Sequence, residues 1–308
     1  MSVRVADDAV RRRASLQLRV ASSLIRLTIR SRLGDMRDLD RMQRVFGGVT
    51  VPPPRGVSFR PDVIGGIPGE WAEAGGGKPL LYLHGGGFVG CSPRTHRTLT
   101  GAYAKRGFRV FAPAYRLAPA HPFPAAIDDA VAAWRGFAEH VGAPAAVAGD
   151  SAGGNLALSL TLIVKNEGRR PAAVALFSPA TDFTGAGESW RTNARRDPMF
   201  TAELANLGAF YLNGADPTDP RASPLFGDLS GLPPILLHVG ETEILRDDSV
   251  RFAKAAEAAG SQVRLQVWDG APHVWQFMHG FVPEARASLD EAAAFLDRAL
   301  EQAADRGP

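Results

Sequence analysis

The chain has 308 residues, of which 45% are hydrophobic and 22% are charged, and its formal net charge is +3. This composition is ordinary for a globular protein, and the length allows one large core with a small accessory segment. The single cysteine, Cys91, excludes an internal disulfide and is expected to be a buried structural thiol in a reducing compartment. No apolar run reaches the length of a membrane-spanning helix, so we expect a cytoplasmic protein without stable membrane insertion.

The N-terminal arm is strongly basic. Residues 1–46 carry eleven arginines and five aspartates, a net charge of +6, against −3 for the rest of the chain. No aromatic residue alternates with these arginines, which argues against nucleic acid. Apolar residues recur at helical spacing in two adjacent stripes, Leu16, Val20, Leu24 and Leu27 in one and Ile25, Ile29 and Leu33 in the other. We predict helices whose apolar face docks on the body of the protein while the arginines face solvent.

Beyond a glycine- and proline-rich linker at 47–54, strand patterns alternate with helix patterns. Strands are predicted near 57–60, 67–74, 80–83, 109–112, 146–149, 174–177, 235–239 and 263–268, and helices near 94–106, 125–140, 151–166, 248–259 and 284–303. Residues 183–215 contain no clear strand and are expected to form a second lid segment. This alternation predicts a mainly parallel sheet with helices on both faces.

A nucleophile elbow is predicted where Gly149, Ser151 and Gly153 follow the spacing Gly-x-Ser-x-Gly. The residues before it suit a short buried strand, and the Ala/Leu-rich run after it suits a buried helix. Glycines are needed on both sides because the sharp turn holds the serine in strained dihedrals, where bulky neighbours would collide with the backbone. The hydroxyl is then exposed at a helix N-terminus, which favours negative charge. Asp150 adjoins the serine but points along the turn.

Three consecutive glycines, Gly85, Gly86 and Gly87, follow a predicted strand and precede the elbow. They allow backbone N–H groups to face a site without side chains in the way. Together with the N–H of Ala152, the residue after the serine, they would form an oxyanion hole. His84 precedes them and is expected to anchor the loop through a hydrogen bond.

His273 is the best-placed candidate for a catalytic base, because it follows the last predicted strand and α/β sheets bind ligands at the C-terminal ends of their strands. The other histidines suit structural positions better: His96 at the pocket edge, His121 in a proline loop, His140 at a helix end, His238 in a buried strand and His279 in the next helix. An acid should follow the strand at 235–239, where the candidates are Glu241, Glu243, Asp247 and Asp248. The last two open a helix and suit N-capping.

These motifs together resemble the hormone-sensitive-lipase-like family of α/β-hydrolases, in its bacterial carboxylesterase branch. The resemblance rests on HGGG at 84–87, GDSAGG at 149–154, YRLAP at 115–119, HPFPA at 121–125 and the late His273 before an apolar pair, and it covers most of residues 55–308. Where the family usually shows Asp-Pro-Leu-Arg-Asp, this chain has Glu243 in the first position. The resemblance implies Ser151 as nucleophile, His273 as base and Glu243 as acid, with Gly86, Gly87 and Ala152 as oxyanion donors.

We therefore expect an α/β-hydrolase fold with a mainly parallel eight-stranded sheet flanked by helices and a helical cap. Residues 1–50 would form the cap together with 183–215, and residues 51–308 the catalytic domain. The expected function is a serine carboxylesterase acting on short- to medium-chain acyl esters, with no metal or organic cofactor. The expected partner is a small-molecule ester, with a homodimer as one option and no nucleic acid. An amidase, a lactone hydrolase or a non-catalytic small-molecule receptor on the same fold remain alternatives.

Overall fold

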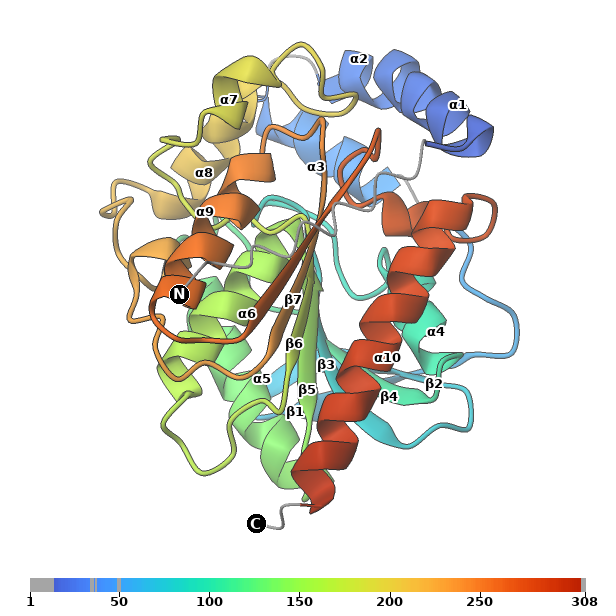
Figure 1. Ribbon diagram of the computed structural model, residues 1–308, viewed down its shortest axis with the longest axis vertical. Coiled ribbons are helices and arrows are strands. Elements are labelled where there is room, and N and C mark those ends of the chain that lie inside the picture. The colour runs from blue at the N-terminus through green and yellow to red at the C-terminus, as the bar shows by residue number, and fades with distance from the viewer. Residues whose placement is uncertain (1–13, 34–35, 37, 49–50, 306–308) are drawn as a thin grey trace.

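The computed structural model describes residues 14–33, 36, 38–48 and 51–305, and an eight-stranded sheet runs through its middle (Figure 1). The strands, in spatial order, are β1 (Ser58–Ile64), β2 (Ile67–Glu73), β4 (Phe108–Pro113), β3 (Lys78–Leu83), β5 (Ala146–Asp150), β6 (Val174–Phe177), β7 (Ile235–Gly240) and β8 (Val263–Trp268). β2 pairs antiparallel with β1 and β4, and all other neighbours are parallel. The predicted sheet is confirmed.

Helices cover both faces of this sheet (Figure 1). The α-helices are α1 (Leu16–Ile25), α2 (Ser31–Leu33), α3 (Leu39–Gly48), α4 (Arg97–Ala104), α5 (Ala125–Val141), α6 (Ser151–Val164), α7 (Ser189–Thr192), α8 (Ala205–Leu212), α9 (Arg246–Ala258) and α10 (Pro283–Asp305). A π-helical turn (Arg26–Arg30) joins α1 to α2, and short 3₁₀ helices lie at Ala202–Leu204, Pro224–Phe226 and Trp275–Met278. α5, α6 and α9 pack on one face of the sheet, and α4 and α10 pack on the other.

The two faces have separate apolar cores because side chains alternate along each strand. In β3, Leu81 and Leu83 belong to the core under α5 and α6, whereas Leu80 and Tyr82 belong to the core under α4 and α10. All four side chains are fully buried. A strand buried on both faces reads as a continuous apolar run, which is why β3 was recognisable from its sequence.

Two segments far apart in the chain meet beyond the C-terminal ends of the parallel strands. α1 to α3 come from the N-terminal arm, and α7 and α8 come from the connection between β6 and β7 (Figure 1). A third apolar cluster joins both segments to the body, and it includes Leu33, Met42, Phe200, Leu207 and Ile244. Within the described ranges, no helix combines the length and apolarity needed to cross a membrane.

The prediction for the first apolar stripe of the N-terminal arm is wrong. Leu16, Val20, Leu24 and Leu27 face solvent, with exposed fractions of 72%, 49%, 55% and 71%. The second stripe is turned inward: Leu33 is buried, and Ile25 and Ile29 are half-buried and line a cavity. The part of this prediction that falls on residues 8–13 lies outside the described residues.

Long-range contacts decide which stripe faces inward. Ser15 caps α1 and donates from its backbone N and its Oγ to the carboxylate of Glu284 in α10, at 2.7 and 2.9 Å. Leu18 is fully buried beside Trp268 and Trp275. Both stripes have helical spacing, so only these tertiary partners could select the rotation of the helix.

The N-capping prediction for Asp247 and Asp248 is also wrong. α9 begins at Arg246, and its N-cap residue is Leu245, which makes no side-chain capping bond. Both aspartates therefore lie within the first turn, and their carboxylates reach outward to the segment after β6. Asp247 accepts a hydrogen bond from the backbone N of Ser189 at 2.9 Å, and Asp248 accepts one from the backbone N of Thr181 at 2.8 Å.

Candidate active site

The turn between β5 and α6 holds Ser151 in the left-handed region, with φ of +52°. The predicted strand–turn–helix is thus present. The backbone of a serine is strained in this conformation. The turn is so tight that a Cβ on Gly149 would lie 2.6 Å from the carbonyl oxygen of Gly153. A Cβ on Gly153 would collide in turn with the backbone of Leu83 and His84. Both glycines are therefore required by the close approach of backbone to backbone.

Buried polar side chains hold the glycine loop at 84–87 in place. His84 stacks on Tyr115 at 4.3 Å between ring centroids, and its Nδ1 lies 2.8 Å from the carbonyl oxygen of Gly85. Burial, and then the neighbouring His96, lower the pKa of His84 to about 3, so its ring is neutral at physiological pH. His84 therefore anchors the loop as expected and is not charged.

Asp150, next to the serine, also fastens this loop. Its carboxylate accepts hydrogen bonds from the hydroxyl of Tyr82 at 2.7 Å and from the backbone N of Gly85 at 3.2 Å. The Nε2 of His96 lies 3.4 Å from the same carboxylate. The Asp150 carboxylate is therefore engaged by Tyr82, Gly85 and His96. Within the described residues, it makes no hydrogen bond to a residue after β7 or β8.

His273 and Glu243 form a buried pair. The Nδ1 of His273 lies 2.7 Å from Oε2 of Glu243, and both side chains are almost completely buried. The other carboxylate oxygen accepts hydrogen bonds from the Oγ of Ser178 at 2.7 Å and the backbone N of Gly240 at 2.6 Å. A carboxylate can only accept, so we assign the proton of the neutral imidazole to Nδ1, which leaves Nε2 free to accept one. Asp247 takes no part in this pair.

Ser151 and His273 line one cavity of about 280 Å³, together with Gly86, Gly87 and Phe200. A second cavity of about 400 Å³ also reaches Ser151, Gly87 and Ala152 and extends beneath α8. The serine therefore lies where two mainly apolar cavities meet. Among the described residues, no hydrogen bond joins Ser151 to His273; such bonds are often long in enzymes without a ligand.

Cys91 lines the cavity that Ser151 and His273 share, and it is half-buried rather than fully buried. Its Sγ lies 3.6 Å from the carbonyl oxygen of Phe46. Burial, followed by the nearby charge of Asp150, raises the pKa of this thiol to about 12. The thiol stays protonated at physiological pH, so it is not a second nucleophile.

Two residues that support this site, one in its cavity and one outside it, carried no signal in the sequence. Phe200 packs edge-on against the imidazole of His273, with ring centroids 4.8 Å apart. Asp197 is fully buried and accepts hydrogen bonds from the backbone N of Phe200 and of Ile244, each at 2.9 Å. It therefore ties the segment that carries Phe200 to the loop that carries Glu243. Neither residue belongs to a strand, helix or glycine motif that would have drawn attention to it.

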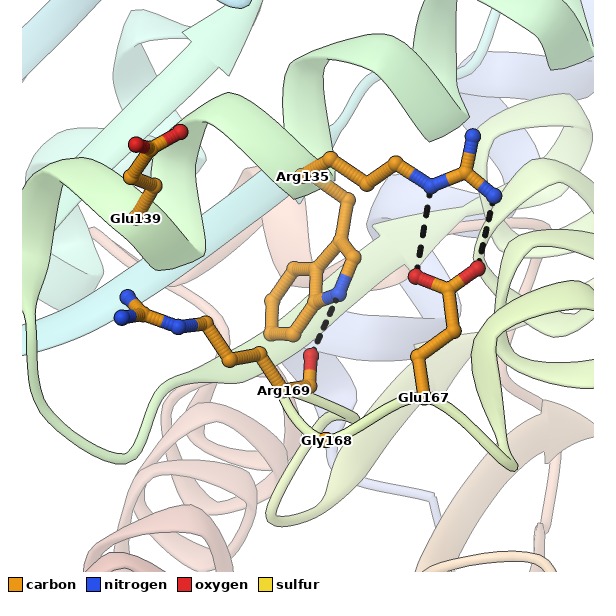
Figure 2. A pocket seen from close by; sticks show the side chains of 6 residues that line it. Arg135, Glu139, Glu167, Gly168 and Arg169 are labelled. Atoms are coloured by element: carbon orange, nitrogen blue, oxygen red, sulfur yellow. Dashed lines mark hydrogen bonds and ion pairs between the residues drawn. The ribbon is translucent and has the colours of Figure 1, made fainter.

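Another pocket, of about 340 Å³, lies between α5 and the turn after α6 (Figure 2). Two of its charged groups pair with each other: Arg135 binds the carboxylate of Glu167 at 2.6 and 3.2 Å (Figure 2). Trp134 donates to the carbonyl of Arg169 at 3.0 Å. Because α6 begins at Ser151 and this pocket lies beyond its other end, roughly 20 Å of helix separate the two. The pocket is therefore unconnected with the serine.

No group of three or more His, Cys, Asp or Glu side chains in the described part of the chain is arranged to hold a metal ion. The arrangement around Ser151 instead combines a strained serine at a helix N-terminus, a glycine loop and a histidine held by a carboxylate. Such a set of groups suits acyl transfer.

Residues 80–277 match the family described as having the alpha/beta hydrolase fold. The chain is 40% identical over 294 residues to an acetyl-hydrolase of Streptomyces hygroscopicus, covering 92% of this chain and 97% of the relative. It is 37% identical over 265 residues to an esterase of Acinetobacter venetianus, covering 83% and 86% of the two chains. The chain therefore belongs to the α/β hydrolases.

Solved structures define the group more narrowly. The fold matches that of EstE5 with a TM-score of 0.89 and 35% identity, covering 94% of this chain and all of that one. It also matches an esterase from the bacterial hormone-sensitive lipase family with a TM-score of 0.84 and 37% identity, covering 93% and 99%. The chain thus belongs to the bacterial hormone-sensitive-lipase-like α/β hydrolases, as its motifs predicted.

Proposed function

We propose that this protein is a carboxylic ester hydrolase that uses Ser151 as its nucleophile. The observation that carries the proposal is the buried hydrogen bond between His273 and Glu243, because His273 lines the same cavity as the strained Ser151. The relatives that are named as esterases and as an acetyl-hydrolase support ester hydrolysis. A receptor that only binds a small molecule would not need a histidine held in one tautomer by a carboxylate.

In the proposed mechanism, Nε2 of His273 takes the proton of Ser151 as its oxygen attacks the ester carbonyl. Glu243 stabilises the imidazolium that forms. The backbone N–H groups of Gly86, Gly87 and Ala152 receive the oxyanion; within the described residues, the first two donate no hydrogen bond elsewhere. His273 then protonates the departing alcohol, and a water molecule repeats the sequence on the acyl-serine.

The division into cap and catalytic domain fits this mechanism. Residues 1–50 and 183–215 would form the cap, and residues 51–308 would supply the reacting groups. The cavity shared by Ser151 and His273 is closed on the cap side by Ile25, Ile29 and Phe46. An apolar cavity of about 280 Å³ favours short to medium acyl chains, because a longer chain would have to displace these side chains.

The test is to trap the acyl-enzyme. After incubation with p-nitrophenyl butyrate and rapid acid quenching, mass spectrometry should find a butyryl group on the peptide that contains Ser151. The Ser151→Ala variant should form no such adduct, and its turnover should fall by roughly a millionfold. Matched butyrate esters, amides and lactones, assayed in parallel, separate an esterase from an amidase or a lactone hydrolase. Normal turnover by folded Ser151→Ala, or an adduct on another residue, would refute the proposal.

A further inference from the structure

The outer face of α1 and the π-helical turn carries an unusual concentration of exposed apolar side chains. In the described part of the chain, eight large apolar residues are strongly exposed, and four of them belong to this one short stretch. These four, Leu16, Val20, Leu24 and Leu27, are three or four residues apart and so form one continuous apolar stripe on the helix surface. Single exposed apolar side chains are ordinary, but a contiguous row marks an interaction site.

The helix cannot rotate to bury this stripe. Its opposite face is occupied by Leu18 and Ala21, which are buried against Trp268 and Trp275. Its N-terminus is fixed by the two hydrogen bonds between Ser15 and Glu284. Turning the apolar stripe inward would expose these core residues and break both bonds, so the stripe stays outside.

The surroundings of the apolar stripe are basic. Residues 16–33 contain four arginines and no acidic residue. Arg19 and Arg32 are exposed. Arg26 donates to the backbone carbonyls of Arg195 and Arg196, so two further exposed arginines border the π-helical turn. Arg196 is paired with Glu241 at 2.8 Å, which leaves Arg195 as the additional positive charge. An apolar row edged by arginines is typical of helices that lie in the plane of a membrane interface.

We propose that the apolar stripe and its arginines form a docking face for the surface of bilayers that contain anionic phospholipids. The leucines would enter the boundary between headgroups and acyl chains, and the arginines would contact the phosphates. A second copy of this chain fits less well, because a two-fold interface pairs this patch with itself, and residues 16–33 offer no acidic side chain to pair with the partner's arginines. Nucleic acid would leave the leucines without an apolar environment.

The docking face lies directly behind the proposed active site. Ile25 and Ile29, from the inward side of the same helical stretch, line the cavity that contains Ser151. One helical layer therefore separates the proposed lipid surface from the serine. Docking would bring the site close to esters dissolved in the bilayer, but binding itself does not depend on the proposed esterase activity.

The experiment measures binding of the full-length protein to lipid vesicles by co-sedimentation. One set of vesicles is phosphatidylcholine, and the other contains about one third phosphatidylglycerol, which supplies the anionic surface. We expect binding to the anionic vesicles, weaker binding to the neutral ones, and a loss of binding as salt is raised to about 0.5 M. The combined Leu16→Ser, Leu24→Ser and Leu27→Ser variant should bind at least about tenfold more weakly.

Two further variants control for charge and for general loss of apolar surface. The double variant Arg19→Glu, Arg32→Glu should bind the anionic vesicles more weakly than the wild type. Its weak binding to the neutral vesicles should be unchanged. Val63→Ser with Phe281→Ser removes exposed apolar side chains elsewhere and should bind like the wild type. All variants should hydrolyse a soluble ester at the wild-type rate, because none of these side chains lines a cavity that reaches Ser151.

The proposal is overturned if the wild type binds neither kind of vesicle, or if the leucine variant binds as well as the wild type. It is also overturned if analytical ultracentrifugation finds a dimer that the leucine substitutions dissociate while vesicle binding is absent, since a second copy would then cover the face. Failure of ester hydrolysis in a protein that still binds vesicles would count against the proposed function alone.

Discussion

Replacing Glu243 with glutamine should remove nearly all turnover while preserving the fold. The carboxylate is fully buried, and all three of its hydrogen-bond partners donate: His273 Nδ1 to one oxygen, and Ser178 Oγ and Gly240 N to the other. Glutamine offers one accepting oxygen and one donating amide. The Gly240 N–H cannot rotate and sits 2.6 Å away, so the glutamine oxygen should turn toward Gly240 and Ser178. The amide then faces His273.

An amide that donates to Nδ1 selects the other imidazole tautomer, with the proton on Nε2. That nitrogen can no longer accept the proton of Ser151, so the proposed general base is lost although every side chain keeps its place. A wrong tautomer of this kind costs about ten-thousandfold in kcat, or roughly 5 kcal/mol of transition-state stabilisation. Because glutamine is isosteric and can keep the bonds to Ser178 and Gly240, the melting temperature should change little.

The matched control is Asp247→Asn, four residues along the same segment. Asp247 accepts from Ser189 N and pairs with Arg246, and it has no contact with His273. Its loss should cost about 1 kcal/mol of stability and change kcat by less than about threefold. The assay is kcat and KM on p-nitrophenyl butyrate, with thermal melting of each variant. More than about one per cent of wild-type kcat in Glu243→Gln, or a collapse in Asp247→Asn, would refute this assignment of the acid.

Three further outcomes are expected. Deleting residues 1–45 removes Ile25 and Ile29, which wall the cavity, so it should expose the remaining apolar lining, lower solubility and broaden or abolish the acyl-chain preference, measured on p-nitrophenyl esters of increasing length; an unchanged profile would argue against a lid. Asp197→Ala should lower kcat more than it raises KM, because it removes the hydrogen bonds that hold the segment from which Phe200 packs on His273. The control is Asp216→Ala, a substitution in an exposed turn. Burial lowers the pKa of His238 to about 3, so the unfolded chain gains a proton below pH 6.5 that the folded chain does not. Stability should therefore fall between pH 6.5 and 3, by roughly 2 kcal/mol at pH 5 for this residue, and His238→Gln should flatten that slope in denaturant titrations.

Much of the scaffold and of the candidate site could be predicted because the constraints on it are local. Gly149 and Gly153 must lack a Cβ where one backbone segment passes close to another, and a serine between them can only be held at a tight turn. The central strands β5, β6 and β7 read as largely apolar runs because both of their faces are buried. His273 was found by its place after the last strand, since parallel strands present their C-terminal ends at one edge.

Other features depend on partners that are remote in sequence. The two apolar stripes of the N-terminal arm have the same spacing, so their pattern could not tell which one faces the protein. Contacts with Glu284 and Trp268 fix the orientation of α1, and both residues follow α1 by more than two hundred positions in the sequence. The aspartates at the start of α9 looked like helix caps, but a helix that begins earlier directs their carboxylates to residues after β6.

The same holds for the surroundings of His273. Its bond to Glu243 joins loops that follow different strands, and the contact with Phe200 comes from a segment without any periodic pattern. The conformation of a turn can be predicted from local sequence, because steric contacts between residues a few positions apart determine it. Which carboxylate meets the imidazole, and which ring packs on it, depends on how β7, β8 and the segment after β6 are brought together, and only the folded chain brings them within contact.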